Sequence, residues 1–270
     1  MRIEAKGLSY TYPDGTAALR GIDLQVQSGE TVLILGHNGA GKSTFVKHLN
    51  GILKPTGGDV FVGEVNTKQH EVSELVHSVA LSFQNPDDQI FSNTVFEEVE
   101  FGPRNLGKTN FTALAKDALR LLHLDDDAPA HPYDLHASRR KMLTIASAVA
   151  MDTPIVVFDE PTVGFDVRQK KIFASLVETL KERKKTILII SHDVDYFFQM
   201  CESIVVIHSG IIEFSGNKSA LAKRKDHRAL LRRSGLPTPT LWRMSRAFGL
   251  ATLPSSTEEF AAAILGESMR

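Results

Sequence analysis

The sequence predicts an α/β fold that is built around a phosphate-binding loop. The first observation is a glycine-rich stretch at residues 36–44, which fits the pattern G-x-x-x-x-G-K-[ST] between an apolar run and a helical segment. The second is a series of further apolar runs of strand length that end in polar or charged residues. Ligands of such sheets bind beyond the carboxyl ends of the strands, so these polar residues are candidates for a binding site.

Composition excludes several broad classes of protein. The chain has 270 residues, enough for one large domain or one domain with an appendage. It carries 31 Lys and Arg against 32 Asp and Glu, so no overall charge favours nucleic acid, and we expect no nucleic-acid partner. Cys201 is the only cysteine, which excludes an internal disulfide and suits a reducing cytosol. Residues 1–6 lack the apolar region of a secretory signal and no apolar run approaches eighteen residues, so we expect membrane contact only through a partner.

Two strands are predicted before the glycine-rich stretch. Residues 3–12 and 19–26 alternate between apolar and polar, and a Pro-Asp-Gly turn lies between them. This pattern favours an antiparallel flap. Tyr12 sits just before the turn, where its ring could stack on a nucleobase or fill the core, and the residues alone leave both possibilities open.

The glycine-rich stretch itself is predicted to cradle phosphate. Residues 31–35 form an apolar strand before it, and the helical segment after it stops at Asn50-Gly51. Glycines let backbone N–H groups curl around an anion, Lys42 can reach the outer phosphates, and the Ser43 hydroxyl can ligate Mg²⁺. The predicted ligand-binding residues are Gly36, His37, Asn38, Gly39, Ala40, Gly41, Lys42, Ser43 and Thr44.

The next segments predict short strands and then a helical insert. Strands are expected at residues 59–62 and 79–83, and Gln84 at the end of the second could reach a metal or a water beside the phosphates. Residues 94–101, 110–122 and 138–151 show helical spacing, with Asn110 as a candidate N-cap. Because no strand interrupts them, they predict a helical subdomain at about residues 85–151.

Two later strands are predicted to deliver acidic and histidine side chains. Residues 155–158 lead directly into Asp159 and Glu160, which suits one carboxylate for Mg²⁺ and one for activating the attacking water. After a helix at residues 167–182, a strand at 186–190 leads to His192, which could hydrogen-bond the terminal phosphate. The candidate catalytic residues are therefore Lys42, Glu160 and His192.

The end of the chain changes in character. Strands at residues 204–207 and 211–214 turn at Ser209-Gly210, and prolines then divide residues 216–270 into short helical pieces. The segment at 218–233 is rich in Lys and Arg. A solvated helical face or a dimer contact is favoured over anion binding for this run.

These motifs, in this order, resemble the ATP-binding cassette (ABC) ATPases over about residues 1–215. The resemblance implies a P-loop NTPase fold of the ABC type with an antiparallel β subdomain, a helical subdomain and a small helical C-terminal extension at 216–270 that could serve dimerisation. It also implies ATP and Mg²⁺ as cofactors. The resemblance implies a role for each motif. In binding MgATP, Tyr12 stacks on adenine, residues 36–44 are the Walker A loop, and Ser43 and the Q-loop residue Gln84 hold the Mg²⁺. In hydrolysis, Asp159 ends the Walker B strand, Glu160 is the general base and His192 is the switch histidine, while residues 164–166 are the D-loop.

A narrower resemblance rests on residues 83–91, Thr94-Val95 and residues 101–103, which look like the ATPase subunit of energy-coupling factor transporters, including cobalt and nickel importers. It implies a peripheral protein at the cytoplasmic face of the cell membrane. Two ATPase subunits, as a homo- or heterodimer, would sit under a transmembrane coupling protein that works with a substrate-binding membrane subunit. The sequence does not name the transported substrate, which would be a metal ion or a vitamin.

One motif departs from the family. Where the family has its Leu-Ser-Gly-Gly-Gln signature, this chain has the run 135–139 and keeps only Leu135. The resemblance places this run and the D-loop against ATP held by the second chain, and the residues concerned are His136, Ala137, Ser138, Arg139 and Asp166. Arg139 and Arg140 could supply charge-assisted bonds in place of the signature, but the added side chains could hinder close approach. We therefore expect the ATP site that this signature completes to hydrolyse ATP poorly, or to use an altered arrangement of contacts to ATP.

Other classes of protein share some of these motifs. A GTPase would need Asn-Lys-x-Asp, and residues 217–220 lack the aspartate. A soluble cassette ATPase acting on DNA or ribosomes usually joins two cassettes or inserts a coiled coil, and this chain has one cassette. A regulatory subunit that binds ATP with little hydrolysis remains open because of the altered signature. His123, His131 and His136 form no recognisable ligand set, so a transported metal is expected to pass through the membrane partner.

Overall fold

The computed structural model describes residues 1–250, 252–254 and 256–268. Its centre is a six-stranded sheet in the order β10-β9-β3-β8-β7-β6. All neighbouring pairs are parallel except β9 and β10, which form an antiparallel hairpin through the predicted Ser209-Gly210 turn. The strands are β3 (Thr31–Leu35), β6 (Val79–Ser82), β7 (Ile155–Asp159), β8 (Thr186–Ser191), β9 (Ser203–His208) and β10 (Ile211–Asn217).

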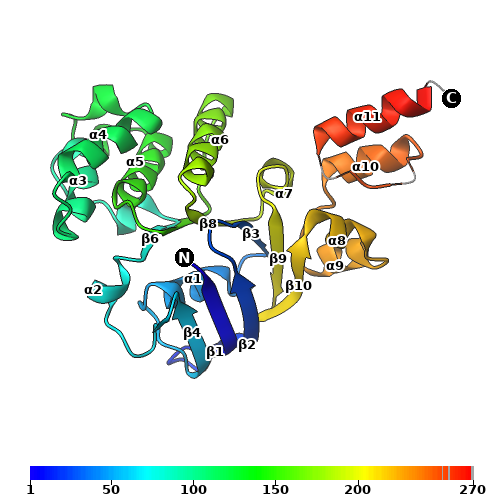
Figure 1. The fold of residues 1–270 in the computed structure, drawn as a ribbon, viewed down its shortest axis with the longest axis horizontal. Coiled ribbons are helices and arrows are strands. Elements are labelled where there is room, and N and C mark those ends of the chain that lie inside the picture. Colours follow the sequence, from blue (N-terminus) through cyan, green and yellow to red (C-terminus); the bar gives the residue numbers. More distant parts are fainter. Residues whose placement is uncertain (251, 255, 269–270) are drawn as a thin grey trace.

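A smaller antiparallel sheet forms the predicted flap. Its order is β2-β1-β4-β5, with β1 (Ile3–Thr11), β2 (Ala17–Val26), β4 (Gly57–Val62) and β5 (Val65–Asn66). This sheet and helix α1 (Lys42–Leu49) lie on one side of the six-stranded sheet, whereas α6 (Val167–Glu182) and α7 (Val194–Phe197) lie on the other (Figure 1). The predicted α/β fold is confirmed.

The buried strands separate two hydrophobic cores. Successive side chains of a strand point to opposite faces, so Leu33 and Leu35 of β3 enter the core under α6, while Val32 and Ile34 enter the core shared with α1 and the antiparallel sheet. Every residue of β3, β7 and β8 is buried. Burial on both faces explains why these strands appear in the sequence as continuous apolar runs.

Three helices form the insert at one end of the molecule (Figure 1). They are α3 (Val95–Asn105), α4 (Phe111–Leu121) and α5 (Ala137–Ala150), which pack against one another. Thr94 caps α3 by accepting a hydrogen bond from the Glu97 backbone N–H at 3.1 Å. Asn110 occupies the predicted N-cap position of α4, but its side chain makes no capping hydrogen bond. The four-residue helices α2 (Val72–Leu75) and α7 were not expected from the sequence.

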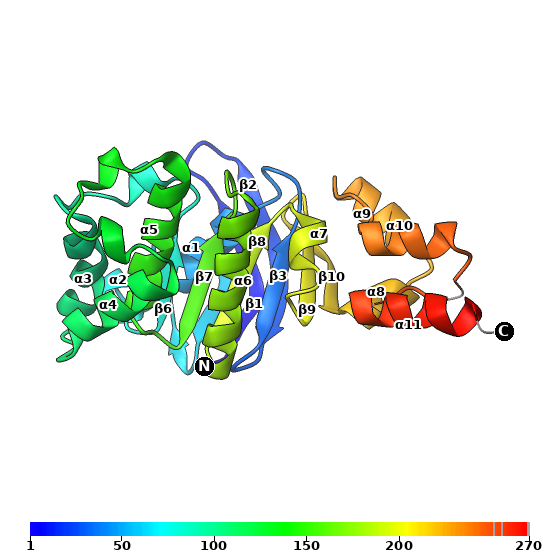
Figure 2. The same cartoon turned by 90° about the horizontal axis from the view of Figure 1, so that it is seen from above.

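The C-terminal helices lie at the opposite end from this insert (Figures 1 and 2). They are α8 (Lys218–Lys223), α9 (His227–Arg233), α10 (Thr240–Ala247) and α11 (Thr257–Ser268). The buried ring of Trp242 attaches α10 to the core because it packs edge-on against Phe198, with ring centroids 5.1 Å apart. Among the described residues, no helix combines the length and the apolar character that a membrane span requires.

Candidate nucleotide-binding site

The glycine-rich stretch forms a tight loop between β3 and α1. Gly39 and Gly41 adopt φ values of +81° and +105°, which other residues rarely tolerate. A Cβ atom on Gly36 would lie 2.3 Å from the carbonyl oxygen of Ile207 on the neighbouring strand. The Lys42 Nζ atom donates to the carbonyl oxygens of Gly36 at 2.7 Å and His37 at 3.0 Å, so the ammonium lies within the loop. Burial lowers the pKa of Lys42, while Glu160 and Asp159 act in the opposite direction.

One cavity of about 380 Å³ brings most of the predicted site residues together. The cradle follows β3, Gln84 follows β6, and Asp159 and Glu160 end or follow β7. These parallel strands present their carboxyl ends at the same edge of the sheet, which is the physical reason for the convergence. The lining residues are Tyr12, Thr16, Ala17, Ala18, Asn38, Gly39, Gly41, Lys42, Ser43, Thr44, Gln84, Asp159 and Glu160. Of the predicted loop residues, Gly36, His37 and Ala40 do not line it.

Tyr12 packs within the flap and also lines the cavity. Its ring packs edge-on against Tyr10, with centroids 4.9 Å apart, and its hydroxyl lies 2.9 Å from the Thr44 hydroxyl. The same half-buried ring lines the cavity. Tyr12 therefore joins the antiparallel flap to the start of α1, and it forms part of the cavity wall.

Asp159 provides an acceptor that suits a cation. Its side chain is buried, and Oδ1 has no hydrogen-bond partner among the described residues. Burial raises the pKa of Asp159, while Ser43, Lys141 and Lys42 act in the opposite direction. An unpartnered carboxylate oxygen and the Ser43 hydroxyl in one cavity form an oxygen-rich donor set of the kind that Mg²⁺ prefers. The residues present therefore fit this ion.

Glu160 is held by the strand that delivers His192. The Glu160 Oε1 atom lies 2.9 Å from His192 Nδ1, and Oε2 accepts a hydrogen bond from the Ser191 hydroxyl at 3.1 Å. Glu160 has φ +45°, an unusual backbone conformation for a residue other than glycine. His192 does not line the cavity, and its side chain is 60% exposed, so it reaches the site through Glu160.

No sequence motif pointed to Lys141. This residue of α5 is 3% exposed, and its Nζ atom donates to the carbonyl oxygens of Phe83, Gln84 and Asp159. Burial lowers the pKa of Lys141 to about 8, although Asp159 and Glu160 favour its charged form. Its place four residues before the buried Ile145, on a predicted amphipathic helix, was the one available signal.

The residues of the altered signature lie outside the cavity. His136 and Ala137 are exposed at the start of α5, and the Ser138 hydroxyl accepts a hydrogen bond from Gln169 Nε2 at 2.9 Å. Asp166 is exposed at the N-cap of α6, where its side chain accepts a hydrogen bond from the Gln169 backbone N–H.

Both arginines that follow Ser138 are paired inside the chain. Arg139 forms an ion pair with Asp127 and donates to the His123 carbonyl oxygen at 3.0 Å. Arg140 donates to the Leu135 carbonyl oxygen at 2.8 Å. These bonds direct part of each guanidinium group toward its own chain and restrict how it could turn toward phosphate on a second chain.

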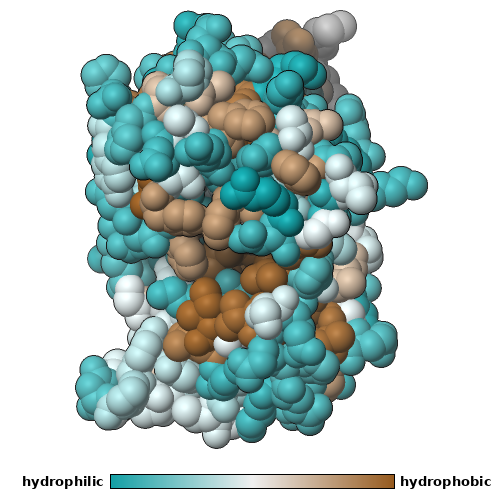
Figure 3. Space-filling model, turned by 90° about the vertical axis from the view of Figure 1, so that its left-hand side faces the viewer, coloured by the Kyte–Doolittle hydropathy of each residue, from teal (hydrophilic) through white to brown (hydrophobic). Residues whose placement is uncertain are grey.

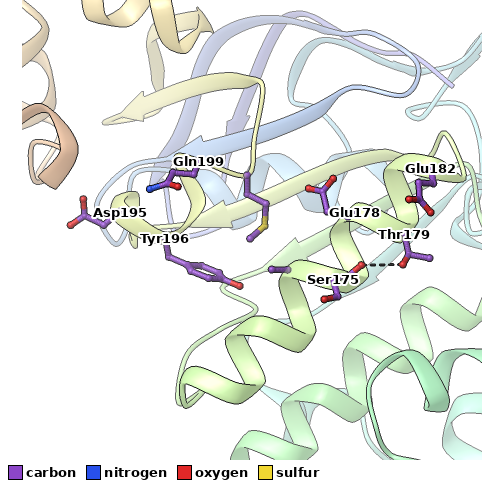
Figure 4. Close-up of a pocket in the computed structure, with 9 residues that line it drawn as sticks. Ser175, Glu178, Thr179, Glu182, Asp195, Tyr196 and Gln199 are labelled. Atoms are coloured by element: carbon purple, nitrogen blue, oxygen red, sulfur yellow. Dashed lines mark hydrogen bonds between the residues drawn. The ribbon is translucent and has the colours of Figure 1, made fainter. Parts of the chain in front are cut away.

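A larger groove of about 690 Å³ lies between α6 and α7 (Figure 4). Its wall carries the carboxylates of Glu178, Glu182 and Asp195, and none of the described residues that line it is a lysine or an arginine. Without a basic side chain in its lining, this groove offers phosphate no charge-assisted hydrogen bond. The smaller cavity at the cradle is therefore the candidate nucleotide site.

A strand, a glycine-rich loop and a helix beside a strand that ends in Asp159 define a P-loop nucleotide-binding protein. A family model described as "ABC transporter" matches residues 19–163. The chain therefore belongs to the ABC transporter family, whose ATP-binding subunits bind and hydrolyse ATP, and it is an ATPase of that family.

The chain is similar to particular members of this family. The chain is 33% identical to the energy-coupling factor transporter ATP-binding protein EcfA of Carboxydothermus hydrogenoformans, over 96% of each protein. It is 36% identical to a provisionally named ABC transporter ATP-binding protein of Caldanaerobacter subterraneus, covering 95% of this chain but 45% of that relative. Its fold matches CbiO1 of Clostridium perfringens, described as part of the ABC transporter complex CbiONQ, with a TM-score of 0.73, 30% identity and coverage of 92% of this chain and 98% of that one.

Proposed function

We propose that this chain is the ATPase subunit that energises import of a transition-metal ion, cobalt or nickel, or of a vitamin, through an energy-coupling factor transporter. It acts at the cytoplasmic face of the cell membrane, with a second ATPase subunit, a transmembrane coupling protein and a substrate-binding membrane subunit. The observation that carries the proposal is the single cavity in which Tyr12, the cradle, Gln84, Asp159 and Glu160 meet. The similarity to energy-coupling factor ATP-binding proteins supports the transport role.

The geometry supports a division of labour within this site. Lys42 moves from the Gly36 and His37 carbonyl oxygens to the outer phosphates of ATP, which offer it a full negative charge. Glu160 accepts a proton from the water that attacks the terminal phosphorus, and the bond from that phosphorus to the ADP oxygen breaks. His192 orients Glu160 through their 2.9 Å contact. Ser43, Gln84 and Asp159 would hold a Mg²⁺ ion, which would neutralise negative charge on the phosphates when bound.

An exposed aromatic pair supports docking to a membrane protein. Phe91 and Phe101 are 62% and 36% exposed, and their rings pack edge-on with centroids 4.6 Å apart. Hydrophobic surface also gathers on the face of the molecule at the helical-insert end (Figure 3). Large exposed aromatic residues next to one another indicate an interaction surface. We assign this surface to the transmembrane coupling protein.

Reconstitution tests this proposal. Proteoliposomes are prepared with this chain, the second ATPase subunit and the membrane subunits of the proposed transporter. ATP hydrolysis and the uptake of cobalt, nickel and vitamins are then measured. Stimulated hydrolysis together with ATP-dependent uptake is expected, and a Phe91→Ser/Phe101→Ser double variant should lose the stimulation while binding ATP normally. Hydrolysis that no membrane subunit stimulates would contradict the proposal and favour a soluble cassette ATPase.

A second candidate is a regulatory subunit that binds ATP but hydrolyses little. The observation that favours it is the pairing of Arg139 with Asp127, which leaves the altered signature without a free guanidinium group. Restoring the family signature through His136→Ser, Ala137→Gly, Ser138→Gly and Arg139→Gln tests this candidate. A clear rise in hydrolysis would show that the altered signature limits turnover. An unchanged rate would show that the altered signature does not limit turnover.

A further inference from the structure

Lys141 joins three parts of the chain that are far apart in the sequence. Its Nζ atom lies 2.6 Å from the carbonyl oxygen of Phe83, 2.9 Å from that of Gln84 and 2.9 Å from that of Asp159. Phe83 and Gln84 directly follow β6, Asp159 is the last residue of β7, and Lys141 itself belongs to α5. One side chain of the helical insert therefore holds the ends of two core strands.

The chemistry of lysine fits this role closely. An ammonium group has three N–H donors and no acceptor, so it can serve three carbonyl oxygens at once. Glutamine offers two donors and methionine none. The ammonium binds the main-chain oxygen of Asp159, and Oδ1 of that carboxylate stays without a partner among the described residues. Lys141 thus brings positive charge to this end of the cavity without occupying the oxygen that would bind a cation.

A second contact ties the same end of α5 to the core. The Ser138 hydroxyl accepts a hydrogen bond from Gln169 Nε2 at 2.9 Å, and Gln169 also belongs to the capping box of α6. The first turns of α5 are therefore connected both to the strand ends that carry Gln84 and Asp159 and to the start of α6. A shift of α5 would therefore move or break its contacts at each of these positions.

We propose that Lys141 is a positioning residue for ATP hydrolysis, which holds Gln84 and Asp159 in register with each other and with the helix that carries the altered signature. This inference rests on the proposed roles of Gln84 and Asp159 at the Mg²⁺ position. Lys141 does not line the cavity, so it acts through these residues. Misplacement of reacting or coordinating groups by about 1 Å can cost on the order of 100-fold in rate.

The test compares Lys141→Met, which removes all donors, with Lys141→Gln, which keeps two. Lys54→Met is the matched control, because Lys54 donates to the carbonyl oxygens of Thr67 and His70 and does not line the cavity. Steady-state ATP hydrolysis by the full chain with its transporter partners gives kcat and KM. Calorimetry gives the Kd for ATP with and without Mg²⁺, and thermal melting reports folding.

We expect Lys141→Met to lower kcat about 10- to 100-fold with a KM within about threefold of the parent value. Binding of ATP without Mg²⁺ should be unchanged, while the gain in affinity on adding Mg²⁺ should shrink. Lys141→Gln should lie between Met and the parent protein, and Lys54→Met should keep the parent kcat. If Lys141→Met does not fold, the same measurements on Lys141→Gln decide whether Lys141 acts as a positioning residue.

Unchanged kcat and Mg²⁺ response in folded Lys141 variants would overturn the inference and leave only a structural role. A loss of kcat as large in Lys54→Met would overturn it as well. Glu160→Gln, measured in parallel, separates this failure from that of the proposed site. If Glu160→Gln is inactive and Lys141→Met is fully active, only the inference on Lys141 is wrong; if Glu160→Gln is fully active, both are wrong.

Discussion

Replacing Glu160 with glutamine tests the proposed base with little change to the structure. The amide has the shape of the carboxylate, and its oxygen can still accept the hydrogen bond that the Ser191 hydroxyl donates at 3.1 Å. The Ser191 oxygen also accepts from the Asp193 backbone N–H at 3.0 Å, which keeps this hydroxyl in place. The amide nitrogen can donate to His192 Nδ1 if the other ring nitrogen carries the proton. We therefore expect the variant to fold and to bind ATP normally.

The effect on hydrolysis should be large because only the basic oxygen is lost. Removal of a general base typically costs about 10²- to 10⁴-fold in rate, which corresponds to about 3 to 5 kcal/mol of activation free energy. The assay is single-turnover hydrolysis of labelled ATP, with ATP affinity measured by calorimetry on the same samples. Glu182→Gln on α6 is the matched control, since Glu182 is exposed and does not line the cradle cavity. If Glu160→Gln keeps more than about a tenth of the parent rate, the loss of rate is smaller than removal of a general base causes, and the assignment of Glu160 as the base is refuted.

Three further predictions concern binding, packing and reactivity. Lys42→Ala should weaken MgATP binding by about 10- to 100-fold in calorimetry, because hydrogen bonds to charged groups contribute about 1.5–3 kcal/mol, and unchanged affinity would count against the cradle. Gly36→Ala should destabilise the fold by about 1–3 kcal/mol in denaturant unfolding, since the new methyl group would lie 2.3 Å from the Ile207 carbonyl oxygen, and a stable variant with parent affinity would contradict this packing. Burial raises the pKa of Cys201 to about 12, so the thiol should resist iodoacetamide at pH 8 until the protein unfolds. The fold should also lose stability as the pH rises above the ordinary thiol pKa of 9.0, because only the unfolded chain then releases this proton. Rapid labelling of the native protein would contradict this prediction.

The sequence was sufficient for the cradle and the buried strands because their signals are local. A glycine motif between an apolar run and a helix needs no knowledge of distant residues, and β3 spans the predicted residues 31–35. Helix α6 likewise has the predicted bounds, Val167–Glu182. The helices α2 and α7 were missed because four residues are too few to show a helical repeat.

The remaining features of the site depend on tertiary contacts. The acceptors of Lys141 lie 58, 57 and 18 residues away in the sequence, so no local pattern could reveal that a buried lysine joins them. The partners of Arg139 were hidden for the same reason, because Asp127 ends a short 3₁₀ helix between α4 and α5. The sequence showed which side chains were available, and the fold determined which of them were already paired.

This pairing changes what the altered signature can offer to a second chain. The polar groups of Ser138, Arg139 and Lys141 all bind partners within their own chain, at Gln169, Asp127 and the strand ends. His136 makes no side-chain hydrogen bond that would cap α5, so no side-chain acceptor from this N-cap satisfies the first N–H groups of the helix. A phosphate brought by the second chain would therefore meet backbone N–H groups and the positive end of the α5 dipole before it met a free guanidinium group. In the proposed dimer, binding of ATP across the interface would rely on the backbone of α5, and the side chains of Ser138, Arg139 and Lys141 would chiefly hold that backbone in place.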